Sequence, residues 1–157
     1  MEFPDVRYVY TEIKGEGGYY TTMIPHFQQD LYSISTVASI PCTQVDSCDP
    51  DYAIIYISSA MSIWHLDPSA TLYILADGER FSYTDDSPGF SAGIYHMAET
   101  ASVIIPIDEF QNIASADSVR AQLNNFEIDF SWETRRYYRD LISALHERNP
   151  EKYFSEY

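Results

Sequence analysis

The stretch TLYILADGERFSY, residues 71–83, determines the fold class because it places two short strand patterns on either side of a turn signal. Apolar residues alternate with other residues before and after Asp77-Gly78, as they do in a strand with one buried face. Asp-Gly favours a type I′ turn, because both residues tolerate the positive φ that this turn requires. The pattern predicts an antiparallel hairpin, in which Asp77, Glu79 and Arg80 are solvent-facing turn residues rather than a working site.

Further strands are expected wherever Tyr, Val, Thr and Ile dominate a short segment. The segments of this composition are 6–13, 19–24, 31–40, 52–60 and 94–105, and 62–66 continues the fourth or pairs near it. Residues 52–60, YAIIYISSA, are almost continuously apolar, so we expect a central strand covered on both faces. Residues 85–93, DDSPGFSAG, are expected to form a flexible loop.

Helices are expected only in the last third of the chain. Asp108 is followed three residues later by Gln111, a capping-box arrangement that predicts the start of a short helix. A second tight hairpin is expected around Asn124-Asn125, which separates two alternating segments. Ser131 is expected to cap a final helix, in which apolar residues recur at helical spacing.

This order of elements, strands first and then helix, hairpin and helix, predicts an α+β fold. We expect a mainly antiparallel β-sheet, with a short helix and a C-terminal amphipathic helix packed against it. No linker or repeat divides residues 1–157, so a single domain is expected, and its tail at 150–157 is either flexible or docked.

Three motifs in the second half of the chain are ILADGERF (74–81), IPIDEFQNIASADSVRAQL (105–123) and FEIDFS (126–131), followed by the amphipathic helix. On these motifs, residues 71–147 resemble a recurrent domain of uncharacterised bacterial proteins. The resemblance implies strand, turn, strand, short helix, hairpin and helix. No activity is attached to that domain, so the resemblance implies no functional site.

The chain is strongly acidic. Asp and Glu number 24 against 9 Lys and Arg, which gives a formal charge of −15. Such a field repels phosphate backbones and anionic membranes and attracts basic surfaces, so we expect no direct nucleic-acid binding and no membrane binding. The charge serves either a basic partner or solubility.

The compartment depends on the natural start of the chain and on its cysteines. The first residues carry no signal-peptide pattern, so a cytoplasmic location is expected if Met1 is the natural start, whereas a secreted origin stays open for a trimmed chain. Cys42 and Cys48 either close a small disulfide ring outside the cell or are free thiols in the cytosol, and the cytosolic setting favours thiols. Their spacing disfavours a metal pair.

The sequence predicts no catalytic residue, no cofactor and no metal. No G-x-S-x-G motif surrounds a serine, and the four histidines, His26, His65, His96 and His146, are scattered without ligand spacing. The acidic loop VDSCDPDY lacks the glycine and the terminal Glu of a calcium-binding EF-hand. A small hydrolase or metal-assisted enzyme that uses His65 or His96 stays an alternative.

Candidate binding residues are tyrosines in predicted strands and carboxylates in loops. Tyr offers a large contact area at low entropy cost, and half of the side chains of a strand face outward. The tyrosines in such strands are Tyr8, Tyr10, Tyr19, Tyr20, Tyr32, Tyr52 and Tyr56, of which Tyr8 and Tyr10 are the leading candidates. The acidic candidates are Asp46, Asp49, Asp51, Asp85 and Asp86.

Three arginines in TRRYYRD, Arg135, Arg136 and Arg139, lie on one flank of the last helix. They either pair with nearby carboxylates or form an anion-binding or protein-docking patch, because Arg binds carboxylates in a bidentate fashion. The nearby carboxylates are Asp129, Glu133 and Asp140.

The leading hypothesis is a non-enzymatic acidic binding protein that engages a basic protein partner through a surface rich in Tyr and carboxylates. A second hypothesis is a small inhibitor from a phage or mobile element, whose carboxylates imitate nucleic-acid phosphates. The oligomeric state does not follow from the sequence.

Overall fold

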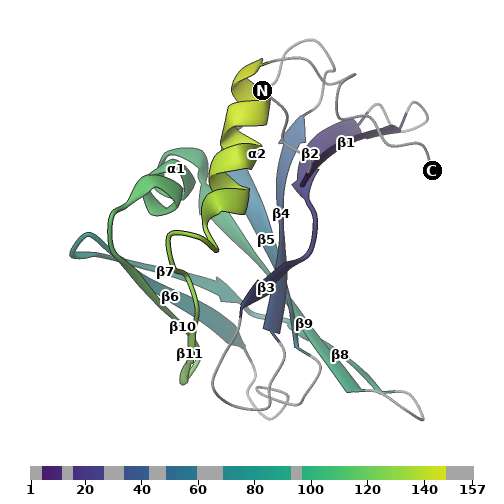
Figure 1. Ribbon diagram of the computed structural model, residues 1–157. Helices are drawn as coiled ribbons and strands as arrows, with labels where there is room; N and C mark the ends of the chain where they lie inside the picture. Colours follow the sequence, from purple (N-terminus) through teal and green to yellow (C-terminus); the bar gives the residue numbers. More distant parts are fainter. Residues whose placement is uncertain are drawn as a thin grey trace.

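The computed structural model describes residues 5–11, 16–26, 34–42, 49–59, 69–92 and 97–147. These residues form two antiparallel sheets and two helices, which is the expected α+β fold (Figure 1). No helix among them is long and apolar enough to cross a membrane.

The large sheet has the strand order β1-β2-β4-β5-β9-β8, and β3 pairs with β4 beyond the end of β2. Its strands are β1 (Val6–Thr11), β2 (Glu16–Thr21), β3 (Ile24–His26), β4 (Ile34–Cys42), β5 (Tyr52–Ser59), β8 (Gly89–Ala92) and β9 (Met97–Pro106). The small sheet has the order β11-β10-β6-β7. Its strands are β6 (Ala70–Ala76), β7 (Glu79–Asp85), β10 (Val119–Leu123) and β11 (Phe126–Ile128).

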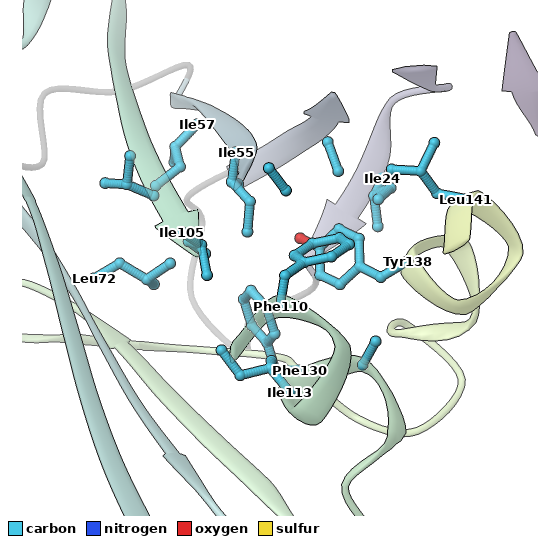
Figure 2. Close-up of a cluster of buried hydrophobic side chains, with 14 of the residues drawn as sticks. Ile24, Ile55, Ile57, Leu72, Ile105, Phe110, Ile113, Phe130, Tyr138 and Leu141 are labelled. Atoms are coloured by element: carbon cyan, nitrogen blue, oxygen red, sulfur yellow. The ribbon is translucent and has the colours of Figure 1, made fainter. Parts of the chain in front are cut away.

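Both helices pack on the same side of the large sheet as the small sheet. Helix α1 (Ile107–Ser115) contacts β5 and β9, and α2 (Arg136–Glu147) contacts α1, β1 and β2. Figure 2 shows Ile55 and Ile105 of the large sheet and Phe110 of α1 in the middle of this cluster, with Leu72 of the small sheet on one side and Tyr138 of α2 on the other. These buried side chains form one core, as expected for one domain.

Both predicted tight hairpins are confirmed. Asp77 and Gly78 connect β6 to β7 with φ of 48° and 86°, and Asn124 connects β10 to β11 with φ of 51°. The Asp77 carboxylate also accepts hydrogen bonds from the backbone N–H groups of Asp117 (3.2 Å) and Ser118 (2.9 Å). The hairpin tip is thereby fastened to the loop that follows α1.

The expectation that residues 52–60 are covered on both faces is wrong. Strand β5 is central, between β4 and β9, but Tyr52 and Tyr56 on its outer face are 39% and 42% exposed. Figure 1 shows both helices and the small sheet on the opposite side of β5. The continuous apolar run therefore belongs to a one-sided antiparallel strand whose outward residues are apolar as well.

Other elements begin or end differently from the prediction. Part of the expected loop at 85–93 forms β8, which pairs with β9 despite its Gly and Ser content. Helix α1 begins at Ile107 behind the N-cap residue Pro106, so Asp108 lies in the first turn and no side chain caps the helix. The backbone N–H of Ile107 instead donates to the carbonyl of Asp51 (3.0 Å).

The short strand β3 was not expected from the sequence, and the strand expected at 31–40 is observed as β4 at Ile34–Cys42. Ser131 accepts a hydrogen bond at Oγ from the backbone N–H of Thr134 (3.3 Å), so it caps the turn that leads into α2. The expectations for 62–66 and 150–157 concern residues outside the described ranges.

Candidate functional site

The outer side of the large sheet carries no charged side chain on its three central strands. The outward residues of β4, β5 and β9 are Ser35, Val37, Ser39, Pro41, Tyr52, Ile54, Tyr56, Ser58, Thr100, Ser102, Ile104 and Pro106. We call these residues, together with Tyr20 of the neighbouring strand β2, the tyrosine face. Charged residues make up 21% of the chain, so a solvent-facing sheet surface without them is unusual here.

Register explains why these residues share one face. Ile54 lies opposite Ser39 on one side and Ile104 on the other, and Tyr56 lies between Val37 and Ser102. The alternate residues of β5 are fully buried against the core, so the strand pleat directs the Tyr52, Ile54 and Tyr56 row outward. Ile104 is 62% exposed, so this face is accessible to solvent.

Three phenol groups gather at the centre of the tyrosine face. Burial raises the pKa of Tyr56, and the neighbouring phenols of Tyr20 and Tyr52 raise it further. Ser39 lies opposite Tyr20 and Ile54 and is only 2% exposed, because larger side chains surround it. The result is an aromatic and aliphatic surface in which Ser39 lies beneath the larger side chains.

Four of the predicted acidic candidates lie around this face. Asp49 and Asp51 are exposed just before Tyr52, and Asp86 is exposed just after β7. Asp85 is partly buried, because its two carboxylate oxygens accept hydrogen bonds from the backbone N–H groups of Ser87 and Ser102, both at 2.9 Å. Asp85 is thus tied to Ser102 of the tyrosine face and has a structural role. Asp46 lies outside the described residues.

A shallow cavity of about 410 Å³ joins Asp85 to the tyrosine face. Its lining includes the hydroxyl side chains of Tyr56, Ser58, Thr100 and Ser102. Hydroxyl groups both donate and accept hydrogen bonds, so this end of the face can pair with polar groups of either kind.

Tyr8 does not belong to an exposed surface. It is 2% exposed, and its ring packs against that of Tyr19 with centroids 5.0 Å apart in the core. The side chain of Tyr10 is outside the described part of the structure. Among the described tyrosines of the large sheet, Tyr20, Tyr52 and Tyr56 face outward, whereas the leading candidate Tyr8 is in the core. A binding role of any of these tyrosines stays a prediction.

Arg135 is a buried structural residue and not part of a docking patch. It is 1% exposed, and it donates from Nε to the carbonyl of Phe130 (2.7 Å). Its Nη1 donates to the carbonyls of Ile113 (2.9 Å) and Ala116 (2.6 Å), at the C-terminal end of α1. A cation at this end satisfies the free carbonyls and opposes the negative pole of the helix.

Arg139 acts on the same helix end, whereas Arg136 is exposed. Arg139 donates to the carbonyls of Ala114 (3.1 Å) and Trp132 (2.7 Å) and stacks 3.6 Å above the Trp132 ring. Arg136 pairs with Asp5 at 3.4 Å and Asp140 at 4.0 Å. Pairing with Asp140 was expected. For the other two arginines, neither expected role is observed, because backbone carbonyls are their partners.

His26 is buried in a hydrogen-bonded chain of polar groups. Its Nδ1 lies 2.6 Å from the carbonyl of Asp129, its Nε2 lies 2.8 Å from Thr36 Oγ1, and Thr36 Oγ1 lies 3.0 Å from the Tyr138 hydroxyl. A carbonyl only accepts, so Nδ1 carries the proton, Thr36 donates to Nε2, and Tyr138 donates to Thr36. Burial lowers the pKa of His26. The chain joins β3, β4 and α2 and has a structural role.

The structure offers no metal centre among the described residues, because no group of His, Cys, Asp or Glu there could hold an ion. His65 and His96 lie outside the described ranges. Cys42, at the end of β4, is disulfide-bonded, so of the two alternatives that the sequence left open the structure has the disulfide for this residue. Cys48 is outside the described residues.

Comparison with known proteins finds no family model, no curated protein and no solved structure that matches the chain. The resemblance of residues 71–147 to a recurrent bacterial domain therefore stays a prediction.

Proposed function

We propose that this chain is a non-catalytic binding protein that docks a protein partner on the tyrosine face. The observation that carries the proposal is the lack of charge across the outward residues of β4, β5 and β9. Protein interfaces have the same anatomy, since their centres are depleted of charged residues and enriched in aromatic ones.

The surroundings of the face favour a basic partner. Asp49, Asp51 and Asp86 are exposed near its border, while its centre is neutral. Charged groups at the rim of an interface mainly accelerate the encounter, and buried aromatic groups at the centre supply most of the binding energy. With a net charge of −15, the whole chain attracts a basic surface over several ångströms before contact.

The same arrangement gives less support to mimicry of nucleic acid. A mimic of a phosphate backbone needs regularly spaced carboxylates across its contact surface. On the tyrosine face the carboxylates lie at the border only, so the acidic inhibitor is the weaker proposal.

The disulfide at Cys42 supports the proposal that the protein functions outside the reducing cytoplasm. Disulfides persist in oxidising compartments and are rare in the cytosol. Thiol labelling of the protein isolated from its host tests this point. No reactive thiol is expected. Labelling of Cys42 would contradict the disulfide and favour the cytoplasmic location expected from the sequence.

The docking proposal is tested by removing the aromatic centre of the face. The double variant Tyr52→Ser, Tyr56→Ser truncates two outward rings of β5. The control is Tyr73→Ser, because Tyr73 is 48% exposed on β6 of the small sheet, away from the tyrosine face. Each protein is immobilised, and host proteins that bind it are quantified by mass spectrometry and then purified for affinity measurement.

A purified basic protein that binds the wild type and the Tyr73 variant alike, and the double variant at least tenfold more weakly, supports the proposal. Equal binding by all three proteins contradicts it. Light scattering supplies the remaining outcome, because self-association that disappears only in the double variant would assign the face to a second copy of this chain.

A further inference from the structure

A shallow cleft of about 260 Å³ crosses the outer face of the small sheet. Leu72 and Ile74 of β6 are buried in the core, so the alternate residues Tyr73 and Leu75 lie on the opposite face. Tyr73 is 48% exposed and lines the cleft. The cleft is therefore open to solvent on the side of the small sheet that faces away from the core.

The residues that line this cleft belong to neighbouring rows of register partners across the small sheet. The rows are Phe81, Ile74 and Ala121; Arg80, Leu75 and Arg120; and Tyr73 and Gln122, with Glu127 beside Gln122. In the middle row the side chains of Ile74 and Ala121 are buried, so the backbone of this row forms the floor. The outward side chains of the other two rows form the walls.

Two arginines lie in the same wall. Arg80 of β7 and Arg120 of β10 are the register partners of Leu75 on either side of β6, and both are exposed. Neighbouring strands lie about 4.8 Å apart, so the Cα atoms of the two arginines are roughly 10 Å apart across the cleft. Both side chains line the cleft, so their guanidinium groups can reach one small anion above Leu75.

The sequence places Arg80 among solvent-facing turn residues rather than in a site. Arg80 is exposed, as expected, but it is the second residue of β7. The pairing of β6 with both β7 and β10 brings it to the same cleft as Arg120, which lies 40 positions later in the chain.

Both arginines are available to a ligand. Arg80 has no ion pair within the part of the chain that the structure describes, although the chain carries 24 acidic and 9 basic residues. Nη2 of Arg120 lies 2.6 Å from Oε1 of Glu127, but these side chains are 74% and 64% exposed. An ion pair between such exposed side chains contributes little to stability, so an anion can compete with Glu127 for Arg120.

We propose that this cleft binds a small aromatic carboxylate. A guanidinium group binds a carboxylate through charge-assisted hydrogen bonds, and Arg80 and Arg120 supply two such groups. The exposed ring of Tyr73 and the side chain of Leu75 supply aromatic and aliphatic contacts for the rest of the ligand. The volume lies just below the range of pockets for drug-sized ligands, about 300–1,000 Å³, so a ligand with one or two rings fits.

A phosphate ester fits the cleft less well than a carboxylate. Two arginines and one glutamate give the lining a charge of about +1, which matches one carboxylate. A phosphate group carries a charge of about −1.5 to −2 at neutral pH. Glu127 and the net charge of −15 repel this larger charge more strongly.

The test uses benzoate as the probe, benzamide as its uncharged counterpart and phenyl phosphate as its more highly charged counterpart. Binding is measured by NMR titration, in which shifts of the backbone amides of β6, β7 and β10 locate the site. Benzoate is expected to shift the amides along the cleft and to bind at least tenfold more tightly than benzamide. It is expected to bind several-fold more tightly than phenyl phosphate.

Variants of the lining test the role of each charge. Arg80→Met and Arg120→Met are each expected to weaken benzoate binding about tenfold or more, because a charge-assisted hydrogen bond is lost. Glu127→Gln is expected to strengthen it several-fold, because Arg120 loses its competing partner. The control is Arg136→Met, which removes an exposed arginine of α2 and changes the net charge equally, and it should bind like the wild type.

No binding of benzoate to the wild type, or equal binding of benzoate and benzamide, would overturn the site. Equal losses in the Arg80 and Arg136 variants would mean that overall charge attracts the probe, which overturns the site as well. Weaker binding by Glu127→Gln would contradict the competition for Arg120. Tighter binding of phenyl phosphate than of benzoate would overturn the assignment to a carboxylate.

The cleft shares no residue with the tyrosine face, so the two proposals can be tested separately. The double variant Tyr52→Ser, Tyr56→Ser should bind benzoate like the wild type. Tyr73→Ser should weaken benzoate binding several-fold while it keeps the docking of a basic partner. Each of these variants is thus a control for the other, and each proposal can fail alone.

Discussion

Replacement of Arg135 by Leu tests the structural role of this buried cation. The three carbonyl groups that its guanidinium contacts belong to Phe130, Ile113 and Ala116. Leu fills part of the same volume but donates no hydrogen bond. The end of α1 and the chain before α2 then lose the group that joins them.

The magnitude follows from the three acceptors. A buried carbonyl left without a donor costs about 1–3 kcal/mol, so three of them sum to roughly 3–9 kcal/mol. The variant no longer has to desolvate a cation, which offsets part of that sum. We therefore expect a net loss of about 3–5 kcal/mol in the free energy of unfolding, a large part of the stability of an ordinary domain.

Urea unfolding monitored by tryptophan fluorescence and circular dichroism measures this loss. Arg139→Met and Arg136→Met supply a graded comparison. Arg139 has two carbonyl partners and a stacked ring, so about 1–3 kcal/mol is expected, whereas the exposed ion pairs of Arg136 give about 0–1 kcal/mol. If Arg135→Leu does not fold, Arg135→Lys replaces it in the test. Lys keeps the charge but lacks the planar guanidinium, so this variant should fold with a free energy of unfolding below that of the wild type. A loss below 1 kcal/mol for Arg135→Leu would refute the reasoning.

Three further predictions concern the turn, the buried histidine and the acidic rim. Gly78→Val should lower stability by about 1–3 kcal/mol in thermal melts, because φ is 86° and a β-branched residue is strained there. No atom lies within 4 Å of an added Cβ, so the loss comes from the backbone and not from a clash. An unchanged midpoint would contradict this. The lowered pKa of His26 means that the unfolded chain takes up a proton first, so stability is complete above pH of about 6.5 and falls as the pH drops below it. Urea titrations at several pH values should show this slope in the wild type and in His146→Gln, but not in His26→Gln. Changing Asp49, Asp51 and Asp86 to Asn should slow association with the natural partner more than it speeds dissociation. Added salt should reduce the association rate of the wild type, since charges are screened over about 8 Å at physiological ionic strength. An association rate independent of salt would mean that the negative charge serves solubility only.

Local signals in the sequence were sufficient for both hairpins. Asp77, Gly78 and Asn124 adopt positive φ, a backbone conformation that Gly, Asp and Asn tolerate better than other residues. The order of strands and helices likewise predicted the α+β class. Helix α1 was predicted in the right place, although its start was not, because the backbone of Asp51 rather than a capping side chain meets its first N–H.

The roles of individual side chains depended on contacts between distant segments. Arg135 and Arg136 are adjacent in the sequence, yet one is buried against the end of α1 and the other pairs with Asp5 at the surface. The sequence alone predicts the same role for Arg135 and Arg136. Only the packing of α2 against α1 separates a structural cation from a solvent-exposed one.

The sequence by itself determined the fold class, the two tight turns and the acidic charge of this protein, because these depend on local conformation and on composition. It did not determine which tyrosines face solvent. Strand β5 has the same apolar pattern whether one face or both are covered, and that outcome depends on where the small sheet and both helices pack. The tertiary structure placed all of them on one side of the large sheet, and this left Tyr20, Tyr52 and Tyr56 on the open side and Tyr8 in the core.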